Sequence, residues 1–282
     1  MITFSADKYY AKLTKAILKQ CPELSYNELR KAIRNKDIKI NGVRIDRDVE
    51  LSQGDKVEIY IKPRNFETYR QGAVYEDQNI AVFYKPKGVQ SVGEDSLSEK
   101  LKNFYDYIEP CHRLDTNTDG LMIFALNENA YNELLFLIKE RKIRKFYKAI
   151  VYGEPKGKKL TLFLVKDSKT GIVKAYEKQV RGASKAETEF RIIKSYGDCS
   201  EIEAELLTGK THQIRVSFAH FGNPILGDGK YGSNTLNRAY KVHKQCLTAY
   251  KLKFNTERSK IFNYLNGKII EIPVKFPVKK QD

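Results

Sequence analysis

Polar residues at the start of a strongly apolar run form the first place where this sequence could carry out chemistry. In CHRLDTNTDGLMIFALN, residues 111–127, His112, Arg113 and Asp115 precede the apolar run LMIFAL. A carboxylate at the start of a buried strand can be held rigidly and kept partly dry, which suits a reactive group. Thr and Asp before Gly120 are also ordinary turn residues. The segment therefore predicts either a reactive carboxylate or a simple turn.

The spacing of residues excludes two other kinds of site here. A protein-kinase catalytic loop has the order His-Arg-Asp, but in this chain Leu114 separates the arginine from the aspartate, and the accompanying GxGxxG and DFG motifs are missing. A metal site needs histidines or cysteines at short spacing, whereas the four histidines form no HxxxH pair and the four cysteines form no CxxC pair. We therefore expect no bound metal.

A second candidate segment, LLTGKTHQIRV at residues 206–216, contains a Gly-Lys-Thr triplet like the end of a phosphate-binding P-loop. That motif needs a glycine five residues before Gly209, so that backbone N–H groups can surround a phosphate, and Ala204 occupies this position. The residues before the triplet alternate between polar and apolar, as in a half-buried strand. The sequence therefore disfavours a nucleotide site, and the histidine and Arg215 need another explanation.

Both segments lie in the longer, C-terminal part of the chain, where the pattern predicts a mixed α+β domain. Amphipathic helices are expected over residues 129–143 and 211–222, the second with Phe218 and Phe221 on its apolar face and Gly222 as its C-cap. Strands are expected over 80–84, 121–126, 146–152, 186–194 and 200–207. Because strands outnumber helices and do not alternate with them regularly, we expect a mixed, largely antiparallel sheet.

The N-terminal part predicts a separate, small α+β domain. A helix is expected around residues 9–17, and Ser25 with Glu28 three residues later forms a capping box that predicts the start of a second helix. IKINGVRI alternates around Asn41-Gly42, a pair typical of hairpin turns, and a further alternating strand follows. The expected organisation is a small domain over 1–66, a linker over 67–73 and a larger domain over 74–282.

The composition indicates either a polyanionic partner or a basic surface that serves solubility alone. The chain has 51 Lys and Arg against 35 Asp and Glu, a formal charge of +16, and such a basic excess attracts nucleic acid. Residues 1–66 carry +5 and the remainder +11, so the basic charge is not confined to one domain. Four widely separated cysteines predict reduced thiols, and no apolar run approaches the ~20 residues of a membrane span. We therefore expect a cytoplasmic protein that does not associate with membranes.

Four separated segments resemble, in the same order, those of the RluA-type pseudouridine synthases. They are FYKPKGV (83–89), HRLDTNTDGLMIFALN (112–127), RKFYKAIVYG (144–153) and LLTGKTHQIRVSFAHFGNPILGDGKYG (206–232). Residues 12–62, with two helices, a hairpin and a strand, resemble the S-four-like domain, a small RNA-binding domain shared with a protein of the small ribosomal subunit. Together these resemblances imply a catalytic domain of pseudouridine synthase type, with a mixed, largely antiparallel sheet, preceded by a small α+β RNA-binding domain.

The resemblance to the synthases also implies a catalytic set. In that family the arginine of HQIR pairs with the aspartate of HRLD, so Arg215 is expected against Asp115; an arginine there favours the charged carboxylate and fixes its orientation. The reaction breaks the N1–C1′ bond of a uridine and rejoins the base through C5, without a cofactor. Asp115 then either attacks C1′ or removes a ribose proton. Tyr147, in the KxYxA motif, is expected to accept the C5 proton; its alternative is an ordinary core aromatic.

The same resemblance implies residues that bind RNA. Arg113 is expected to fill the gap left by an extruded base, or otherwise to contact a phosphate or solvent. His112 is expected to hydrogen-bond RNA or its own loop. Phosphate contacts are expected from Lys85, Lys87, Lys210, Arg30, Lys31 and Arg34; the alternative for each is an ordinary solvated side chain.

Two positions depart from the family pattern. Asp119 stands where a serine is usual. If its carboxylate pointed inward it would oppose ionisation of Asp115, whereas a carboxylate that capped the turn before Gly120 would not; we expect the cap. Lys210 replaces a more usual arginine, which keeps the charge but loses bidentate phosphate recognition.

The sequence therefore predicts a monomeric RNA pseudouridine synthase that modifies specific uridines in structured RNA. Large-subunit ribosomal RNA is the expected substrate, and transfer RNA is the alternative. A catalytically silent RNA-binding or ribosome-assembly protein is the alternative class, although its catalytic set would be expected to be broken and here it is intact. RNA is the expected partner, and neither a cofactor nor a metal is expected.

Overall fold

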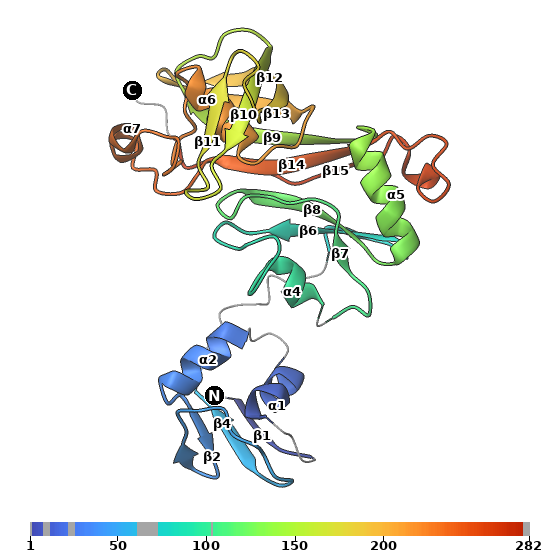
Figure 1. Cartoon of the computed structure of the whole chain (residues 1–282), viewed down its shortest axis with the longest axis vertical. Coiled ribbons are helices and arrows are strands. Elements are labelled where there is room, and N and C mark those ends of the chain that lie inside the picture. The colour runs from blue at the N-terminus through green and yellow to red at the C-terminus, as the bar shows by residue number, and fades with distance from the viewer. Residues whose placement is uncertain (1, 8–11, 22–25, 61–72, 103, 279–282) are drawn as a thin grey trace. The chain divides into compact units, whose positions relative to one another are not determined.

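The chain folds into two compact units (Figure 1). The computed structural model describes residues 2–7, 12–21, 26–60, 73–102 and 104–278, without the side chains of residues 26–28 and 31. The first unit comprises residues 1–72 and 92–106, and the second comprises residues 73–91 and 107–282. The sequence pattern gave no sign that segment 92–106, which contains helix α4 (Leu97–Leu101), groups with the first unit. The expected boundaries at 66 and 74 stay a prediction.

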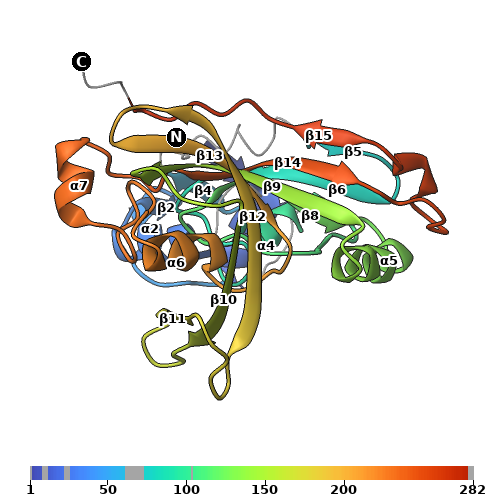
Figure 2. The same cartoon turned by 90° about the horizontal axis from the view of Figure 1, so that it is seen from above.

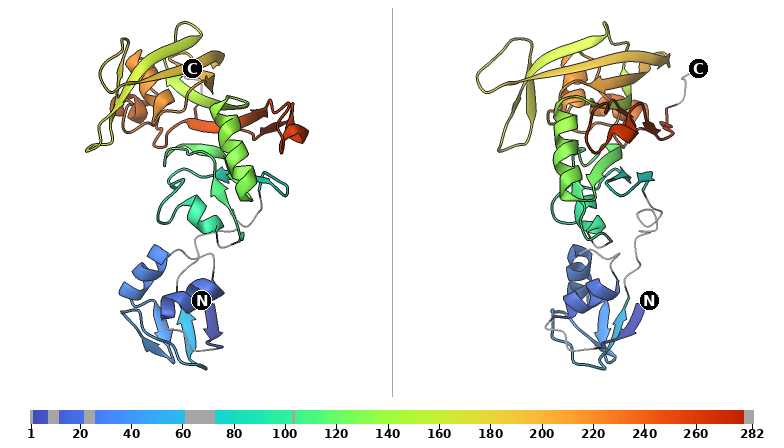
Figure 3. Two further views of the ribbon diagram at one scale, coloured as in Figure 1. Left: turned by 45° about the vertical axis from the view of Figure 1, so that its right-hand side comes forward. Right: turned by 90° about the vertical axis from the view of Figure 1, so that its right-hand side faces the viewer.

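Besides α4, the described residues of the first unit form a small antiparallel sheet and two helices. Its strands, in the order β1-β4-β2-β3, are β1 (Ile2–Ser5), β4 (Lys56–Ile59), β2 (Ile38–Ile40) and β3 (Val43–Arg44). Helices α1 (Leu13–Gln20) and α2 (Tyr26–Arg34) lie over the sheet (Figure 3). Leu13, Ile17 and Leu29 from the helices share one fully buried core with Ile38 and Val57 from the strands. The unit therefore has an apolar core of its own.

The predicted hairpin is confirmed. Asn41 and Gly42 both have positive φ, 50° and 83°, and Ile40 pairs with Val43 across the turn. Strand β1 was not predicted; it is four residues long and is defined by its pairing with the distant strand β4. The capping box at Ser25 and Glu28, the side chain of Lys31 and most of the linker 67–73 lie outside the described residues.

The second unit is built on one large sheet in which every pairing is antiparallel except that between β14 and β8. Along its main path, in spatial order, the strands are β11 (Val173–Tyr176), β10 (Lys159–Lys166), β12 (Ser184–Ser195), β13 (Cys199–Leu206), β9 (Ile143–Tyr152), β14 (Leu247–Phe254), β8 (Asp119–Ala125), β6 (Ile80–Lys85) and β5 (Tyr75–Glu76). Strand β15 (Ile269–Glu271) pairs with β14, and β7 (Glu109–Pro110) pairs with β8. The mixed, largely antiparallel sheet is as predicted.

Helices of the second unit pack at separate places on the sheet. Helix α5 (Glu128–Lys139) buries Leu134 and Leu137 in a core with residues of β6, β8 and β14. Helix α6 (Gln213–His220) packs against β10, β11 and β12, which extend away from the rest of the sheet (Figure 2). The short helix α7 (Asn234–Ala239) and the 3-10 turn η1 (Asn263–Leu265) complete the unit.

A single glycine allows the parallel contact at the centre of this sheet. Gly120 in β8 has φ of +121°, and a Cβ placed on it would lie 2.1 Å from the carbonyl oxygen of Ala249 in β14. A side chain here would separate the two strands, because only glycine permits so close a backbone approach. Gly120 therefore lets the loop that carries Asp115 join the sheet beside β14.

The outcome for the predicted helices is mixed. Both amphipathic helices are present, and Gly222 follows α6 with φ of +79°, as expected of a C-cap. The prediction that Phe221 belongs to the apolar face is wrong: the helix ends at His220, and Phe221 is 45% exposed whereas Phe218 is fully buried. Within the described residues, no helix is both long and apolar enough to cross a bilayer.

Candidate active site

The loop that carries Asp115 is fixed to a neighbouring loop on both sides of that residue. Before it, Ser91 Oγ donates to the carbonyl of Leu114 at 2.7 Å and accepts the N–H of Leu114 at 2.9 Å. After it, the carbonyl of Thr116 accepts from Lys85 Nζ at 3.2 Å. The backbone on each side of Asp115 is therefore held by side chains from residues 85–91, as a rigid reactive group requires.

Lys85 was predicted to contact RNA phosphate, and this prediction is wrong. Its side chain is fully buried, and its ammonium donates to the carbonyls of Pro86 and Val89 as well as to that of Thr116. Burial lowers the pKa of Lys85 to about 8, although the charges of Asp119 and Asp115 act in the opposite direction. A cation without solvent access cannot meet a phosphate, so Lys85 instead fixes the loop of Asp115.

Arg215 lies between two carboxylates. Its Nη1 donates to Asp115 Oδ2 at 2.9 Å, while Nε and Nη2 donate to the two oxygens of Asp228 at 2.7 and 3.0 Å. Arg215 is 6% exposed and Asp228 is 1% exposed. The predicted contact between Arg215 and Asp115 is present. Asp115 Oδ1 has no hydrogen-bond partner among the described residues, so one oxygen of this carboxylate is free.

Asp228 is a residue of this site that the sequence reasoning missed. Burial alone would raise its pKa, but hydrogen bonds and charge from Arg215 outweigh burial and lower it. Its Oδ1 also accepts the backbone N–H groups of Lys230 and Tyr231, at 2.9 and 3.1 Å. The available signal was chemical: a guanidinium has five N–H donors, and one carboxylate with a reactive oxygen cannot satisfy them.

A tight corner between β13 and α6 delivers Arg215. The side chain of Gln213 accepts from Thr208 Oγ1 and the backbone N–H of Lys210, and it donates to Glu187 O and Thr188 Oγ1. These contacts tie the corner to strand β12. Arg215 therefore projects from the first turn of a helix whose start is fixed at several points.

Tyr147 lies at the centre of the sheet, on the face next to Asp115. It pairs with Ala249 of β14, which in turn pairs with Gly120 of β8. Tyr147 is 5% exposed, and burial, followed by the negative charge of Asp115, raises the pKa of its phenol well above the ordinary value. The structure therefore holds Tyr147 as a neutral phenol beside the carboxylate, while the role of this tyrosine stays a prediction.

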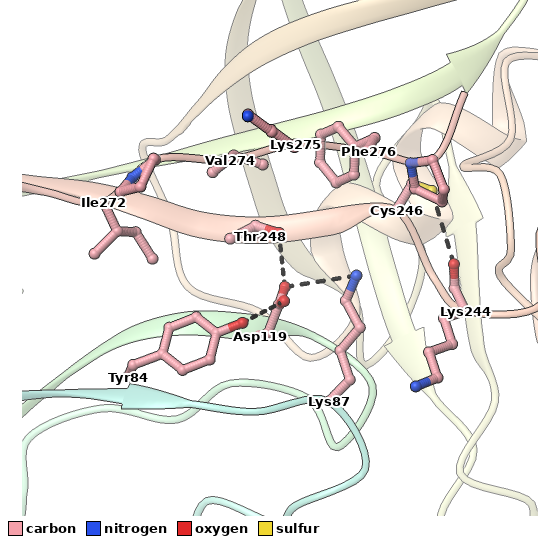
Figure 4. Close-up of a pocket in the computed structure, with 12 residues that line it drawn as sticks. Tyr84, Lys87, Asp119, Lys244, Cys246, Thr248, Ile272, Val274, Lys275 and Phe276 are labelled. Atoms are coloured by element: carbon pink, nitrogen blue, oxygen red, sulfur yellow. Dashed lines mark hydrogen bonds and ion pairs between the residues drawn. The ribbon is translucent and has the colours of Figure 1, made fainter. Parts of the chain in front are cut away.

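Asp119 faces the other side of the sheet. It pairs with Thr248, the neighbour of Ala249, and side chains of successive strand residues point to opposite faces. Its carboxylate accepts from Thr248 Oγ1 at 2.6 Å and from Tyr84 OH at 2.7 Å, and it lies 3.7 Å from Lys87 Nζ, in a pocket of about 240 Å³ (Figure 4). The prediction that Asp119 caps the turn before Gly120 is wrong, because its carboxylate accepts hydrogen bonds from Thr248 and Tyr84 instead.

His112 is held as a neutral imidazole. Its Nε2 accepts the backbone N–H of Ile123 at 3.1 Å, and burial, with a contribution from the charge of Lys145, lowers its pKa to about 3. Its Nδ1 is buried and has no hydrogen-bond partner among the described residues. The observed hydrogen bond is therefore to strand β8 and not to the loop of His112, and contact of this residue with RNA stays a prediction.

The remaining predicted RNA-binding residues differ in accessibility. Arg113 and Lys210 in the second unit are exposed, as are Arg30 and Arg34 in the first. Lys87 is partly buried, and its Nζ lies 3.7 Å from Asp119 Oδ1. Among the residues that the structure describes, no group of three or more His, Cys, Asp or Glu side chains is arranged to hold a metal ion.

The fold and the site together define a class of enzyme. A largely antiparallel sheet holds one partly exposed carboxylate against a buried arginine, beside a buried tyrosine, in a strongly basic chain. A carboxylate held in this way can act as a nucleophile or as a base, and comparisons with known proteins identify the class. The family model described as RNA pseudouridylate synthase matches residues 79–220. The chain belongs to the RNA pseudouridylate synthase family and is an RNA pseudouridine synthase.

Several relatives cover nearly the whole chain. The ribosomal large subunit pseudouridine synthase D of Haemophilus ducreyi is 28% identical over 306 residues, which cover 97% of this chain and 90% of that protein. An uncharacterized RNA pseudouridine synthase of Synechocystis is 31% identical over 250 residues. These residues cover 79% of this chain and 75% of that protein. Among solved structures, human RNA pseudouridylate synthase domain containing 1 has a TM-score of 0.57 at 25% identity, covering 73% of this chain and 83% of its own.

Proposed function

We propose that this enzyme converts specific uridines of large-subunit ribosomal RNA to pseudouridine, with Asp115 as the reactive group. The substrate is inferred from relatives named for the ribosomal large subunit, among them synthase C of Vibrio vulnificus and synthase D of Haemophilus ducreyi. The observation that carries the catalytic assignment is the hydrogen bonding of Arg215, which binds Oδ2 of Asp115 and leaves Oδ1 free. Transfer RNA is the alternative substrate.

The free oxygen of Asp115 suits both chemical routes. It either attacks C1′ as the N1–C1′ bond breaks, so that the uracil leaves with the bonding electrons, or it removes a ribose proton. Arg215 makes two hydrogen bonds to Asp228 and one to Asp115, so its charge is shared. Arg215 therefore orients the carboxylate without fully neutralising it, which preserves reactivity at Oδ1.

Tyr147 is proposed to contact the uracil and to accept the C5 proton after the new C–C bond forms. Burial and the charge of Asp115 keep its phenol protonated at neutral pH. A neutral phenol can accept a proton at oxygen only as it passes its own proton on, here to the carboxylate of Asp115 once the new C–C bond has released it. Tyr147 would therefore act as a proton relay rather than as a free base.

Arg113 is proposed to take the place of the extruded base. It is exposed and lies two residues before Asp115, on a loop that the contacts of Leu114 hold still. Extruding a base from its stack costs a few kcal/mol, and a planar guanidinium can stack in the space that the base leaves. Uridines in loops or bulges are the expected targets, because they are the least stacked.

Mapping pseudouridine in host ribosomal RNA tests this function directly. Deletion of the gene is expected to remove pseudouridine from one or a few large-subunit positions, and expression of the wild-type chain should restore them. If no ribosomal position changes but a transfer RNA position does, the substrate assignment is wrong. If no RNA changes in cells and purified enzyme modifies no total RNA from the deletion strain, the activity itself is refuted.

The first unit is proposed to be an S-four-like RNA-binding domain that uses α2. Arg30 and Arg34 on this helix are exposed. Replacing both with Ala should weaken RNA binding and reduce the slope of log affinity against log salt by about one for each phosphate that the variant no longer binds. The matched control replaces Lys15 and Lys19, exposed on α1, with Ala. Equal losses of affinity in the two variants would contradict a specific role for α2.

A further inference from the structure

His212 has a left-handed backbone conformation at the start of helix α6. It has φ of 55° and ψ of 19°, in the left-handed region, and it is the N-cap of α6. Its side chain makes no capping hydrogen bond; instead Nδ1 lies 2.7 Å from Tyr231 OH. Six other non-glycine residues among those described also have a positive φ, so the contacts of the imidazole, and not its backbone, indicate its role. The imidazole is thus placed for something other than capping the helix.

Tyr231 decides which nitrogen of His212 carries the proton. The hydroxyl oxygen of Tyr231 already accepts the backbone N–H of Val173 at 2.8 Å. Its own proton is therefore best donated to His212 Nδ1, and this places the imidazole proton on Nε2. The opposite tautomer would leave the proton of Tyr231 without an acceptor among the described residues. Burial lowers the pKa of His212, so the ring is neutral and donates at Nε2 alone.

Nε2 of His212 faces the same carboxylate oxygen that Arg215 binds. It lies 4.0 Å from Asp115 Oδ2, which is too far for a direct hydrogen bond. Two atoms at this separation can share one hydroxyl between them, at hydrogen-bond lengths of about 2.8 Å and an angle near ~90° at the hydroxyl oxygen. Such a hydroxyl would accept from Nε2 and donate to Oδ2. The two atoms therefore have the separation and the polarity that a bridging hydroxyl requires.

We propose that His212 and Asp115 Oδ2 together bind the 2′-hydroxyl of the target nucleotide. This inference rests on the proposed function, in which Asp115 Oδ1 acts at C1′ or at a ribose proton. The 2′-hydroxyl is the ribose hydroxyl next to C1′, so it comes closest to Oδ2 when Oδ1 reaches the reacting carbon. A 2′-hydroxyl distinguishes RNA from DNA, which makes His212 a specificity-determining residue for a ribonucleotide.

The charged surroundings of His212 agree with binding a neutral hydroxyl. The groups that act on it electrostatically are Asp115, Asp228, Arg215 and Lys230, two carboxylates and two cations. Their charges balance, and the ring itself is 15% exposed. A phosphate would have to approach Asp115 directly and would be repelled. A neutral hydroxyl that donates a hydrogen bond to the carboxylate is not repelled.

The test compares ribose with deoxyribose at one position. A synthetic RNA hairpin with the uridine identified by mapping is prepared with uridine or 2′-deoxyuridine at that position only. For the wild-type enzyme, the deoxy substitution should lower kcat/KM about 10- to 100-fold, the effect of losing hydrogen bonds to a charged group. In His212→Asn the ratio of kcat/KM for the uridine hairpin to kcat/KM for the deoxyuridine hairpin should be about tenfold smaller than in the wild type. Asn tolerates the left-handed conformation but is too short to reach the hydroxyl.

Two further variants make the result specific to the hydroxyl. Tyr231→Phe removes the hydroxyl that keeps the proton of His212 on Nε2. This variant should reduce the ribose-to-deoxyribose ratio of kcat/KM about two- to tenfold. His243→Asn, at an exposed histidine outside the site, should leave the ratio unchanged. If His212→Asn is too slow to assay, the ratio of dissociation constants for the two hairpins replaces the kinetic ratio, because a purely structural defect would weaken binding of both equally.

The outcomes separate this inference from the proposed function. Failure of the wild-type enzyme to modify the uridine hairpin would refute the proposed function. Modification of uridine and 2′-deoxyuridine at equal rates, or a ratio in His212→Asn equal to that of the wild type, would refute the hydroxyl site and leave the isomerase intact.

Discussion

Replacing Asp115 with Asn is expected to lower the turnover of uridine RNA by on the order of 10⁴-fold, with little effect on folding or RNA affinity. An amide carbonyl can still accept the hydrogen bond from Arg215, so the loop and the ion-pair network keep their geometry. An amide is a poor nucleophile and a poor base, so neither route at the ribose can proceed. Single-turnover assays with excess enzyme measure this loss without interference from product release.

The matched control for this prediction is Asp119→Asn. Asp119 lies four residues away at the end of the same loop, but its side chain is on the other face of the sheet and contacts Tyr84 and Thr248. We expect turnover within about threefold of the wild type and a free energy of unfolding lower by about 1–3 kcal/mol. Equal loss of turnover in the two variants would show that Asp115→Asn acts through the loop and not through chemistry.

The two faces of β8 illustrate what the sequence could and could not reveal. The contact between Asp115 and Arg215 joins residues 100 positions apart, and it was implied by the resemblance to the RluA-type synthases. The orientation of Asp119 did not follow, because the face of a strand residue depends on its register with β14, which is a long-range property. The burial of Lys85 could not be predicted either. Its sequence YKPKG is polar and suggests a surface, yet position 85 is the buried end of β6.

Local signals were reliable where short-range chemistry decides the structure. The Asn41-Gly42 hairpin was predicted correctly because both residues tolerate positive φ. Strand β1 was missed because four residues carry little pattern, and only pairing with β4 defines them. Asp228 was missed because a lone aspartate before glycine suggests a turn. It does form hydrogen bonds with a turn, but it also binds Arg215, and that contact exists only in the folded chain.

Replacing Arg215 with Leu is expected to affect both activity and stability. Asp115 would lose the partner that orients it, which should lower turnover about 10²- to 10³-fold. Asp228 would remain as an almost fully buried carboxylate without a cation, which should lower the free energy of unfolding at pH 7 by about 3–5 kcal/mol. By contrast Arg191→Leu, at an ion pair with Glu203 where the arginine side chain is 69% exposed, should change stability by less than about 1 kcal/mol.

The stability difference between the wild type and Arg215→Leu should depend on pH. In the folded wild type the pKa of Asp228 is lowered, so this carboxylate contributes stability above its ordinary value of 3.8 and loses it as pH falls through the lowered pKa. In the variant, burial is no longer opposed and Asp228 can take up a proton. Urea denaturation followed by circular dichroism should therefore give a large difference at pH 7 and a smaller one below pH ~4.

A second substitution separates the two effects of Arg215. Asp228→Asn in the Arg215→Leu background removes the buried charge but keeps an oxygen that can accept the N–H groups of Lys230 and Tyr231. The double variant should regain about 2 kcal/mol of stability and no activity, because Asp115 still lacks its partner. Recovery of activity together with stability would contradict a direct role of Arg215 at Asp115, and would mean that the arginine serves only to neutralise a buried carboxylate.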